Sequence, residues 1–220
     1  MPLLRTGRSA VPPDVESAPP DRHSLALAEV LRTVAAPGKT QILDLGPANG
    51  ANVAYLSRYA CTLHIADLYR TVGAADGENE EVLERAFDRQ IPQGTFDLVL
   101  AWDLFDYLGR TGLQALGRQL AQRTAPGGLL FALVSFHPRI PDRPHRFQIV
   151  DPETLRYGDP SGLERPAPGY REPDLIRLMP GFEVGGSYLL RHGVQEYLLT
   201  RRQRAAADGD EAEQDVSDRV

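Results

Sequence analysis

Apolar residues follow two alternating patterns along the chain: short, mainly apolar runs and longer repeats at helical spacing. Runs at 42–45, 62–66 and 96–102 are typical of strands, and the nearly continuous run at 96–102 is expected to be buried on both faces of the sheet. Between them, apolar residues three and four positions apart predict helices at 51–59 and 78–91. This alternation indicates an α/β fold with a mostly parallel sheet.

The same patterns extend toward both ends of the chain. A helix is predicted before the first strand, with Asp21 as its N-cap and Pro37-Gly38 at its end. The later predicted elements are a helix through Leu113, Leu116 and Leu120, a strand at 129–136, a short helix at 172–179, and a hairpin with strands at 182–190 and 194–200. We therefore expect a three-layer α/β sandwich whose terminal hairpin is antiparallel.

Three segments lack this periodicity. Residues 1–20 are rich in proline, and residues 203–220 are rich in alanine and then in acids, so both are predicted to be disordered tails. A single domain is expected over 21–202. Within it, residues 137–171 hold seven prolines and six arginines and are predicted to form a loop insertion with one short helix at 152–157.

Composition narrows the possible partners. The chain has 220 residues, of which 42% are hydrophobic, enough for one substantial core. Its net charge of -6 gives no general reason to expect nucleic acid or an anionic membrane as a partner. The lone Cys61 excludes a disulfide framework, and no apolar run is long enough to span a bilayer. We expect a cytoplasmic protein, and the composition leaves its oligomeric state open.

The segment QILDLGPANG at 41–50 runs from the first predicted strand through a glycine-punctuated turn into a helix. Gly46 and Gly50 can take positive φ or let a ligand approach the backbone, and Pro47 stiffens the turn between them. About 20 residues further on, Asp67 ends the second strand, where a carboxylate can accept hydrogen bonds from a ribose diol. The loop and the acid together predict a site for a nucleotide-like cofactor.

The ligand is not expected to be a dinucleotide, because the loop lacks the G-x-G-x-x-G fingerprint and the chain lacks the Tyr-x-x-x-Lys pair of nicotinamide reductases. Asp44, two residues before Gly46, suits a ligand with an ammonium group. Here the chain resembles the class I S-adenosylmethionine-dependent methyltransferases, whose first motif is D/E-x-G-x-x-x-G. The resemblance covers roughly residues 22–200 and includes, in order, DLGPANG at 44–50, Asp67, GTFDLVLAWD at 94–103 and APGGLLF at 125–131.

The resemblance implies a Rossmann-like fold and S-adenosylmethionine as the cofactor. Asp44 would order the loop or approach the ammonium group, and Asp67 would bind the ribose hydroxyls. The residues expected at the cofactor are Asp44, Gly46, Pro47, Ala48, Gly50, Asp67, Leu68, Trp102 and Asp103.

One part of the family pattern is not found. Members of the family have a third strand, at the sheet edge, that ends in an acid reading adenine. Only one helix fits comfortably between Asp67 and Phe96, so this strand is expected to be reduced or missing. Asp88 is the only nearby acid that could replace the adenine contact, and it lies in a helical pattern.

Methyl transfer requires a nucleophile in line with the methyl group and, for a protonated nucleophile, a base. Asp103 and His137 are the candidate catalytic residues, since each follows a strand at the same edge of the sheet. Asp103 could instead cap the next turn, and His137 could be a solvated loop residue. His145, in the proline-rich loop, is an alternative base with the same reservation.

Further polar residues have two interpretations. Arg139, Arg143 and Arg146 could recognise an anionic acceptor or could only solubilise the loop. Asn49 and Asn52 are expected to cap the second helix rather than to contact a ligand.

No metal site is expected, because Asp103 and Asp106, which follow the strand at 96–102, have no supporting asparagine. The predicted function is S-adenosylmethionine-dependent methyl transfer to a small-molecule or other non-nucleic-acid acceptor. The alternative is a noncatalytic methyltransferase-like ligand-binding module, which the missing adenine acid favours.

Overall fold

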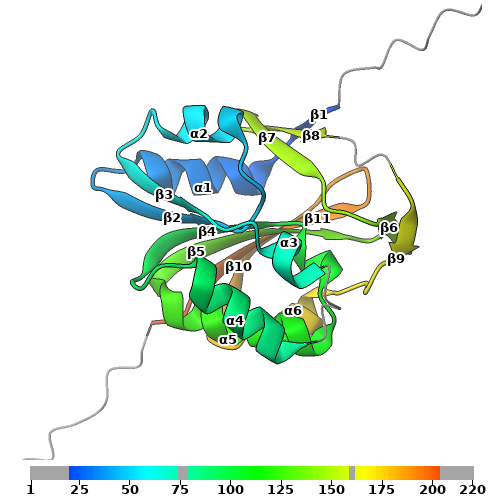
Figure 1. The fold of residues 1–220 in the computed structure, drawn as a ribbon. Helices are drawn as coiled ribbons and strands as arrows, with labels where there is room; N and C mark the ends of the chain where they lie inside the picture. Colours follow the sequence, from blue (N-terminus) through cyan, green and yellow to red (C-terminus); the bar gives the residue numbers. More distant parts are fainter. Residues whose placement is uncertain (1–19, 74–78, 159–161, 204–220) are drawn as a thin grey trace, which may run out of the picture.

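A computed structural model describes residues 20–73, 79–158 and 162–203 of the chain, so both predicted tails lie almost entirely outside the described residues. The centre is a six-stranded sheet in the order β10-β11-β5-β4-β2-β3 (Figure 1). Its strands are β2 (Thr40–Asp44), β3 (Cys61–Ile65), β4 (Phe96–Trp102), β5 (Thr124–Ser135), β10 (Phe182–Leu189) and β11 (Val194–Arg201). The pairs β2–β3, β2–β4 and β4–β5 are parallel, whereas β11 is antiparallel to both of its neighbours.

Helices cover both faces of this sheet. In Figure 1, α1 (Leu25–Ala35) and α2 (Gly50–Leu56) lie on one side, and α4 (Glu80–Gln90), α5 (Arg110–Arg123) and α6 (Glu172–Leu178) lie on the other. The buried side chains form one apolar cluster on each face. Among the described helices, none is long and apolar enough to cross a membrane. The predicted three-layer α/β sandwich with an antiparallel terminal hairpin is confirmed.

The edge of the sheet at β3 also agrees with the prediction. Between β3 and β4, the described residues form the short helix α3 (Leu68–Val72) and α4, which is one helix more than predicted, and they contain no strand. The third strand of the family pattern is therefore missing from the described sheet. Asp88, on α4, is exposed, and its Oδ1 lies 3.7 Å from Nη2 of Arg123.

The first helix begins later than predicted. Asp21 belongs to a short strand, β1 (Asp21–His23), and its carboxylate accepts hydrogen bonds from Nε and Nη2 of Arg156 at 2.7 and 2.9 Å. The N-cap of α1 is Ser24, whose hydroxyl oxygen accepts a hydrogen bond from the backbone N–H of Leu27 at 3.1 Å. The prediction of Asp21 as the cap was wrong, because its partner is more than 130 residues away.

The insertion contains strands rather than a loop with one helix. Its elements are β6 (Arg139–Pro141), β7 (Arg146–Asp151), β8 (Thr154–Gly158) and β9 (Glu164–Pro166). β7 and β8 form a hairpin that pairs with β1, and β6 pairs with β9. The predicted helix at 152–157 was wrong: Leu155 and Tyr157 alternate inward along β8 and pack with α1 and α2 on one face of the main sheet.

Candidate functional site

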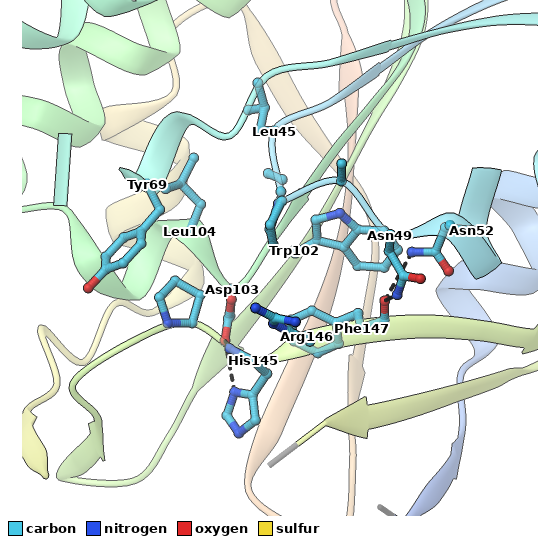
Figure 2. A pocket seen from close by; sticks show the side chains of 16 residues that line it. Leu45, Asn49, Asn52, Tyr69, Trp102, Asp103, Leu104, His145, Arg146 and Phe147 are labelled. Atoms are coloured by element: carbon cyan, nitrogen blue, oxygen red, sulfur yellow. Dashed lines mark hydrogen bonds and ion pairs between the residues drawn. The ribbon is translucent and has the colours of Figure 1, made fainter. Parts of the chain in front are cut away.

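A cavity of about 260 Å³ lies at the carboxyl ends of β2 and β4 (Figure 2). Its walls are the loop at 45–50, the end of β4 at 101–104, and residues 144–147 of the insertion, together with Asn52 and Tyr69. Open α/β sheets bind their ligands at this edge. The predicted cofactor residues among the lining are Gly46, Pro47, Ala48, Gly50, Trp102 and Asp103.

Asp44 ties the loop to the end of β4. Its Oδ1 accepts hydrogen bonds from the backbone N–H of Gly46 at 2.9 Å and from Nε1 of Trp102 at 2.7 Å. Burial raises the pKa of Asp44 to about 6, although both hydrogen bonds oppose the rise. The contacts are those of a loop-ordering residue, one of the two roles predicted for this acid.

The two loop glycines have different surroundings, and neither has positive φ. A Cβ on Gly46 would lie 2.7 Å from Cδ1 of Trp102, so glycine is required there for the indole to approach the loop. A Cβ on Gly50 would meet no atom within 4 Å. Of the two reasons that the sequence offered for these glycines, positive φ is not observed at either position. Close approach to the backbone explains Gly46, and open space beside Gly50 leaves room for a ligand.

Trp102 has an unusual backbone conformation, with φ of 49° in a non-glycine residue. Such conformations are strained and persist where the surrounding structure holds them. Here the indole is held by Asp44 on its edge and stacks on Phe147, with ring centroids 5.3 Å apart and planes inclined by 7°. The stack joins β4 to the insertion.

Residues 142–149 of the insertion, which we call the strap, are hydrogen-bonded across the cavity. The side-chain amides of Asn49 and Asn52 donate to the carbonyl oxygen of Phe147 at 2.8 and 3.0 Å (Figure 2). Oδ1 of Asn52 also accepts from the N–H of Ile149 at 2.8 Å. Asn49 also caps α2, as predicted, whereas Asn52 lies inside the helix and does not. The role of Asn52 was missed, although a polar residue in an apolar helical pattern was a signal.

Two tyrosine hydroxyls hold the other end of the strap. Tyr69 donates to the carbonyl oxygen of Asp142 at 2.8 Å, and Tyr107 donates to that of Arg143 at 2.7 Å. Tyr69 follows β3 and Tyr107 follows β4, so both strand ends take part in fixing the insertion. The strap is therefore a structural part of the cavity wall.

Asp103 and His145 form a pair at this wall. Oδ2 of Asp103 accepts hydrogen bonds from the backbone N–H of His145 at 3.0 Å and from its Nδ1 at 2.9 Å. With Nδ1 as the donor, Nε2 of the neutral ring carries a lone pair and can accept a proton. Asp103 makes no side-chain cap bond to the 3₁₀ helix that follows it, η2 (Leu104–Tyr107). The alternative role of Asp103 as a helix cap is therefore not observed.

Besides Asp44, three of the predicted site residues lie outside the cavity lining. His137 is exposed, and its Nε2 lies 2.8 Å from the carbonyl oxygen of His192 in the turn between β10 and β11. Oδ1 of Asp67 accepts a hydrogen bond from the N–H of Arg70 at 3.3 Å and caps α3. Leu68 is fully buried in the core.

The three arginines predicted for acceptor recognition are separated. Arg146 lines the cavity, whereas Arg143 is exposed and is not among the lining residues. Arg139 donates from Nε to Oε2 of Glu164 at 3.0 Å, and both side chains are more than half exposed. Of the three, only Arg146 can contact a ligand in the cavity directly.

A further buried acid fixes η2 to the sheet. Oδ2 of Asp106 accepts a hydrogen bond from the N–H of Ser135 at 2.8 Å, and burial raises its pKa well above the usual value. Within the described ranges, no group of three or more His, Cys, Asp or Glu side chains is arranged to hold a metal ion.

Residues 20–165 match a family model described as a methyltransferase domain, which is more than half of the chain. The chain belongs to the class I S-adenosylmethionine-dependent methyltransferases. This assignment makes it an enzyme with S-adenosylmethionine as its cofactor, rather than a noncatalytic module. No curated protein sequence is significantly similar to it.

Solved methyltransferase structures resemble this methyltransferase at low sequence identity. The N-methyltransferase NodS from Bradyrhizobium japonicum WM9 is 13% identical, with 80% of this chain and 94% of that chain covered and a TM-score of 0.46. CalS10, an amino pentose methyltransferase from Micromonospora echinaspora, is 18% identical, with coverages of 80% and 89% and a TM-score of 0.47. A methyltransferase from Clostridium acetobutylicum ATCC 824 is 13% identical, with coverages of 81% and 90% and a TM-score of 0.49.

Proposed function

We propose that this methyltransferase transfers the methyl group to a small-molecule acceptor, with His145 as the base and Asp103 as the residue that positions it. The proposal rests mainly on the Asp103–His145 pair, whose 2.9 Å hydrogen bond lies at the wall of the cavity between the two cofactor motifs. His145 replaces His137 in this role, because His137 contacts the last hairpin instead.

The residues at the cavity fit the cofactor. The backbone of the loop at 46–50 is accessible beside Gly50, where a Cβ would meet open space, and Trp102 and Asp103 form the facing wall. We propose that these residues hold the cofactor, that the buried Asp44 carboxylate attracts its ammonium group, and that Asp67 and Leu68 lie next to its ribose. When bound, S-adenosylmethionine supplies an electrophilic methyl group on a sulfonium and leaves as S-adenosylhomocysteine.

Asp103 and His145 then remove the proton from the acceptor. Asp103 accepts from Nδ1 and from the backbone N–H of His145, which fixes both the tautomer and the orientation of the ring. Nε2 of His145 takes the proton that the acceptor loses, and the Asp103 carboxylate stabilises the resulting imidazolium. Trp102 and Phe147 cover the cavity and limit the access of water.

The size of the cavity favours a small acceptor. Its 260 Å³ is just below the range of about 300–1,000 Å³ that ligand sites span. The cofactor takes up part of this space and the strap closes one side, so the room that is left suits only a small acceptor. A polymer could not enter this space while the strap is bonded to Asn49 and Asn52. The net charge of -6 also gives a nucleic acid no general attraction to the surface.

The two histidines allow a direct test. The protein is incubated with S-adenosylmethionine that carries a tritiated methyl group and with the small-molecule fraction of a cell extract, and labelled products are separated by chromatography. We expect labelled product with the wild type and with His137→Ala, and a loss of roughly 100-fold or more with His145→Ala. S-adenosylhomocysteine should bind all three proteins with similar affinity in calorimetry. If His145→Ala keeps its activity and His137→Ala loses it, the assignment of the base is wrong.

A further inference from the structure

Four buried polar atoms without a hydrogen-bond partner among the described residues belong to neighbouring side chains. They are Nε of Arg22 on β1, Oη of Tyr157 on β8, Nε2 of His192 in the last hairpin turn, and Oε1 of Glu196 on β11. The described residues contain six such side-chain atoms, and the other two belong to Asp106 and Thr124. Folded proteins pair almost all buried polar groups, so four orphans in one place require an explanation.

The four side chains, which we call the polar cluster, are close to one another. The ring centroids of Tyr157 and His192 are 5.4 Å apart, and the Arg22 guanidinium carbon lies 5.3 Å from the Tyr157 centroid. Glu196 acts electrostatically on the Tyr157 hydroxyl, as does Arg22 with the opposite sign. The cluster thus combines a carboxylate, a guanidinium, an imidazole and a hydroxyl.

The polar cluster lies next to the cavity. The His145 ring, which pairs with Asp103, is centred 5.9 Å from the Tyr157 ring, and the Phe147 ring is 4.9 Å from it. Both His145 and Phe147 line the cavity. A molecule bound against Tyr157 would therefore lie beside the proposed base.

We propose that Arg22, Tyr157, His192 and Glu196 recognise the methyl acceptor, and that this acceptor is a small amine that also carries oxygen acceptors, as an amino acid or an amino sugar does. The inference rests on the proposed function, because it assigns the substrate class of the same site. The four atoms lack partners in the protein because the acceptor supplies them.

Glu196 is the reason to expect an amine. Its side chain is fully buried, and its Oε2 accepts a hydrogen bond from the N–H of Ala26 at 3.1 Å, which leaves Oε1 unpaired. A buried carboxylate is costly unless it is paired, and an ammonium group satisfies it best. Burial also raises the pKa of Glu196, although hydrogen bonds from Ser24, Ala26 and Leu25 and the nearby His23 oppose the rise.

The remaining three groups call for oxygen atoms on the same ligand. Nε of Arg22 can only donate, whereas Tyr157 can donate or accept. Burial, together with nearby Arg22, lowers the pKa of His192 to about 4, so its ring is neutral at physiological pH. The charges of Arg22 and Glu196 cancel, which fits a neutral or zwitterionic ligand better than a strong anion.

Removal of the unpaired Tyr157 hydroxyl provides a test, because it should weaken acceptor binding without lowering folding stability. In Tyr157→Phe, no protein hydrogen bond is lost, so the melting temperature should be unchanged or higher. The KM for the acceptor should rise roughly 3- to 10-fold, with kcat and the affinity for S-adenosylhomocysteine unchanged. Tyr188→Phe, on the same hairpin as His192, is the matched control and should alter none of these values.

Glu196→Gln tests the amine. The amide oxygen can still accept from Ala26, while an N–H group replaces the unpaired oxygen. Loss of a charged hydrogen bond should weaken amine binding roughly 10- to 150-fold, again without a loss of folding stability.

The probes are two mixtures, one of amino acids and one of amino sugars. The control for the amino acids is a mixture of the corresponding hydroxy acids, and the control for the amino sugars is a mixture of the parent sugars. Their binding to the complex of the full chain with S-adenosylhomocysteine is measured by calorimetry, and tritium transfer from S-adenosylmethionine is measured in parallel. We expect one amine mixture to bind and to accept label, and its deaminated counterpart to do neither; which mixture does so distinguishes the two sources.

The two readouts separate the failure of this inference from that of the proposed function. Amine binding that Tyr157→Phe and Glu196→Gln weaken, without any methyl transfer, would support the recognition site and overturn the catalytic proposal. The inference would be overturned if the deaminated counterparts accepted the methyl group as well as the amines do, or if neither variant affected methyl transfer. A lower melting temperature in Tyr157→Phe would also overturn it, because the hydroxyl would then have a hydrogen-bond partner in the ligand-free protein.

Discussion

The two sides of the Phe147 ring differ in how their polar groups are satisfied. On the cavity side, Asp44, Asn52 and Asp103 each accept or donate hydrogen bonds within the protein at 2.7 to 3.0 Å. On the side of Tyr157, the polar cluster has four buried atoms without a partner among the described residues. Both regions are built from the insertion and the main sheet, so the difference does not come from their location in the fold.

This difference indicates two roles: the paired groups at the cavity preorganise the site, and the unpaired groups of the polar cluster recognise a ligand. Polar groups that the chain satisfies itself hold the cavity in shape before any ligand arrives, so their removal should cost stability. Polar groups whose partner is supplied by the ligand lower the folding stability when the ligand is absent. Their removal should therefore weaken ligand binding without lowering stability. The predictions below test this contrast at the cavity, where a substitution at a polar group that the chain itself satisfies should change the melting temperature as well as cofactor binding.

The largest effect is expected for Gly46→Ala. A Cβ there would lie 2.7 Å from Cδ1 of Trp102, so the indole must move, and its hydrogen bond to Asp44 would break. We expect a loss of about 2 to 4 kcal/mol of folding stability and a drop of roughly 30-fold or more in affinity for S-adenosylhomocysteine. Denaturant unfolding and calorimetry measure the two quantities.

Gly50→Ala is the matched control for this substitution. A Cβ at Gly50 meets nothing within 4 Å, and alanine favours the first turn of α2, so its stability should be equal or slightly higher. If Gly46→Ala behaved like Gly50→Ala, the packing of Trp102 on the loop would not be what holds the cavity in shape.

The contrast between Gly46 and Trp102 also shows what could be predicted from sequence. The loop, the acid before it and the strand ends form local patterns, so the sheet and its terminal hairpin were predicted correctly. The sequence carries no local signal that a tryptophan 56 residues beyond Gly46 fills the space beside it. The need for glycine was foreseen, but the neighbour that imposes it was not.

The insertion was predicted less well, and the reason is physical. Its prolines and arginines hide the alternation of Phe147, Ile149, Leu155 and Tyr157, and its strand β8 pairs with β1, which lies more than 120 residues earlier. Pairing at that separation leaves no periodic trace in a single sequence. For the same reason His145 and His137 could not be ranked, because only the folded strap shows which histidine meets Asp103.

The second-largest effect is expected for Asp44→Asn, and it is a change in how folding stability depends on pH. The pKa of Asp44 in the folded protein, about 6, is above its usual value of 3.8, so its contribution to stability is complete below pH 3.8 and is lost as the pH rises through 6. Asp44→Asn keeps Oδ1 as the acceptor for both hydrogen bonds and removes this loss. Relative to the wild type, the variant should gain up to about 3 kcal/mol as the pH rises from about 4 to about 8.

Denaturant unfolding of both proteins across this range measures that gain, and the difference between them cancels the contributions of Asp106 and other shared groups. Affinity for S-adenosylhomocysteine should change in the opposite sense, rising with pH in the wild type and staying flat in Asp44→Asn, if the carboxylate attracts the ammonium group. A difference in stability that does not vary with pH would show that Asp44 is not the titrating group.

A smaller effect is expected for the bonds that hold the strap. Asn52→Leu preserves the approximate shape of the side chain but leaves the N–H of Ile149 without its acceptor, which should cost about 1 to 3 kcal/mol. Because the strap then loosens, S-adenosylhomocysteine should dissociate several-fold faster in stopped-flow measurements. Asn79→Ala removes the N-cap of α4, away from the cavity, and should cost about 1 kcal/mol without changing the dissociation rate. Equal dissociation rates in the two variants would show that the strap does not control the cavity.

The smallest effects are expected at the two arginines that the structure separates. Arg146 lines the cavity next to His145, so Arg146→Ala should raise the KM for the acceptor a few-fold while leaving stability within about 0.5 kcal/mol of the wild type. Arg139 forms an exposed ion pair with Glu164, of the kind that contributes about 0 to 1 kcal/mol, so Arg139→Ala should leave the acceptor kinetics unchanged. Steady-state kinetics and thermal unfolding of the two variants decide this. An equal change in KM would mean that the two arginines act through their positive charge in general. Arg146 would then make no specific contact in the cavity that Arg139 lacks.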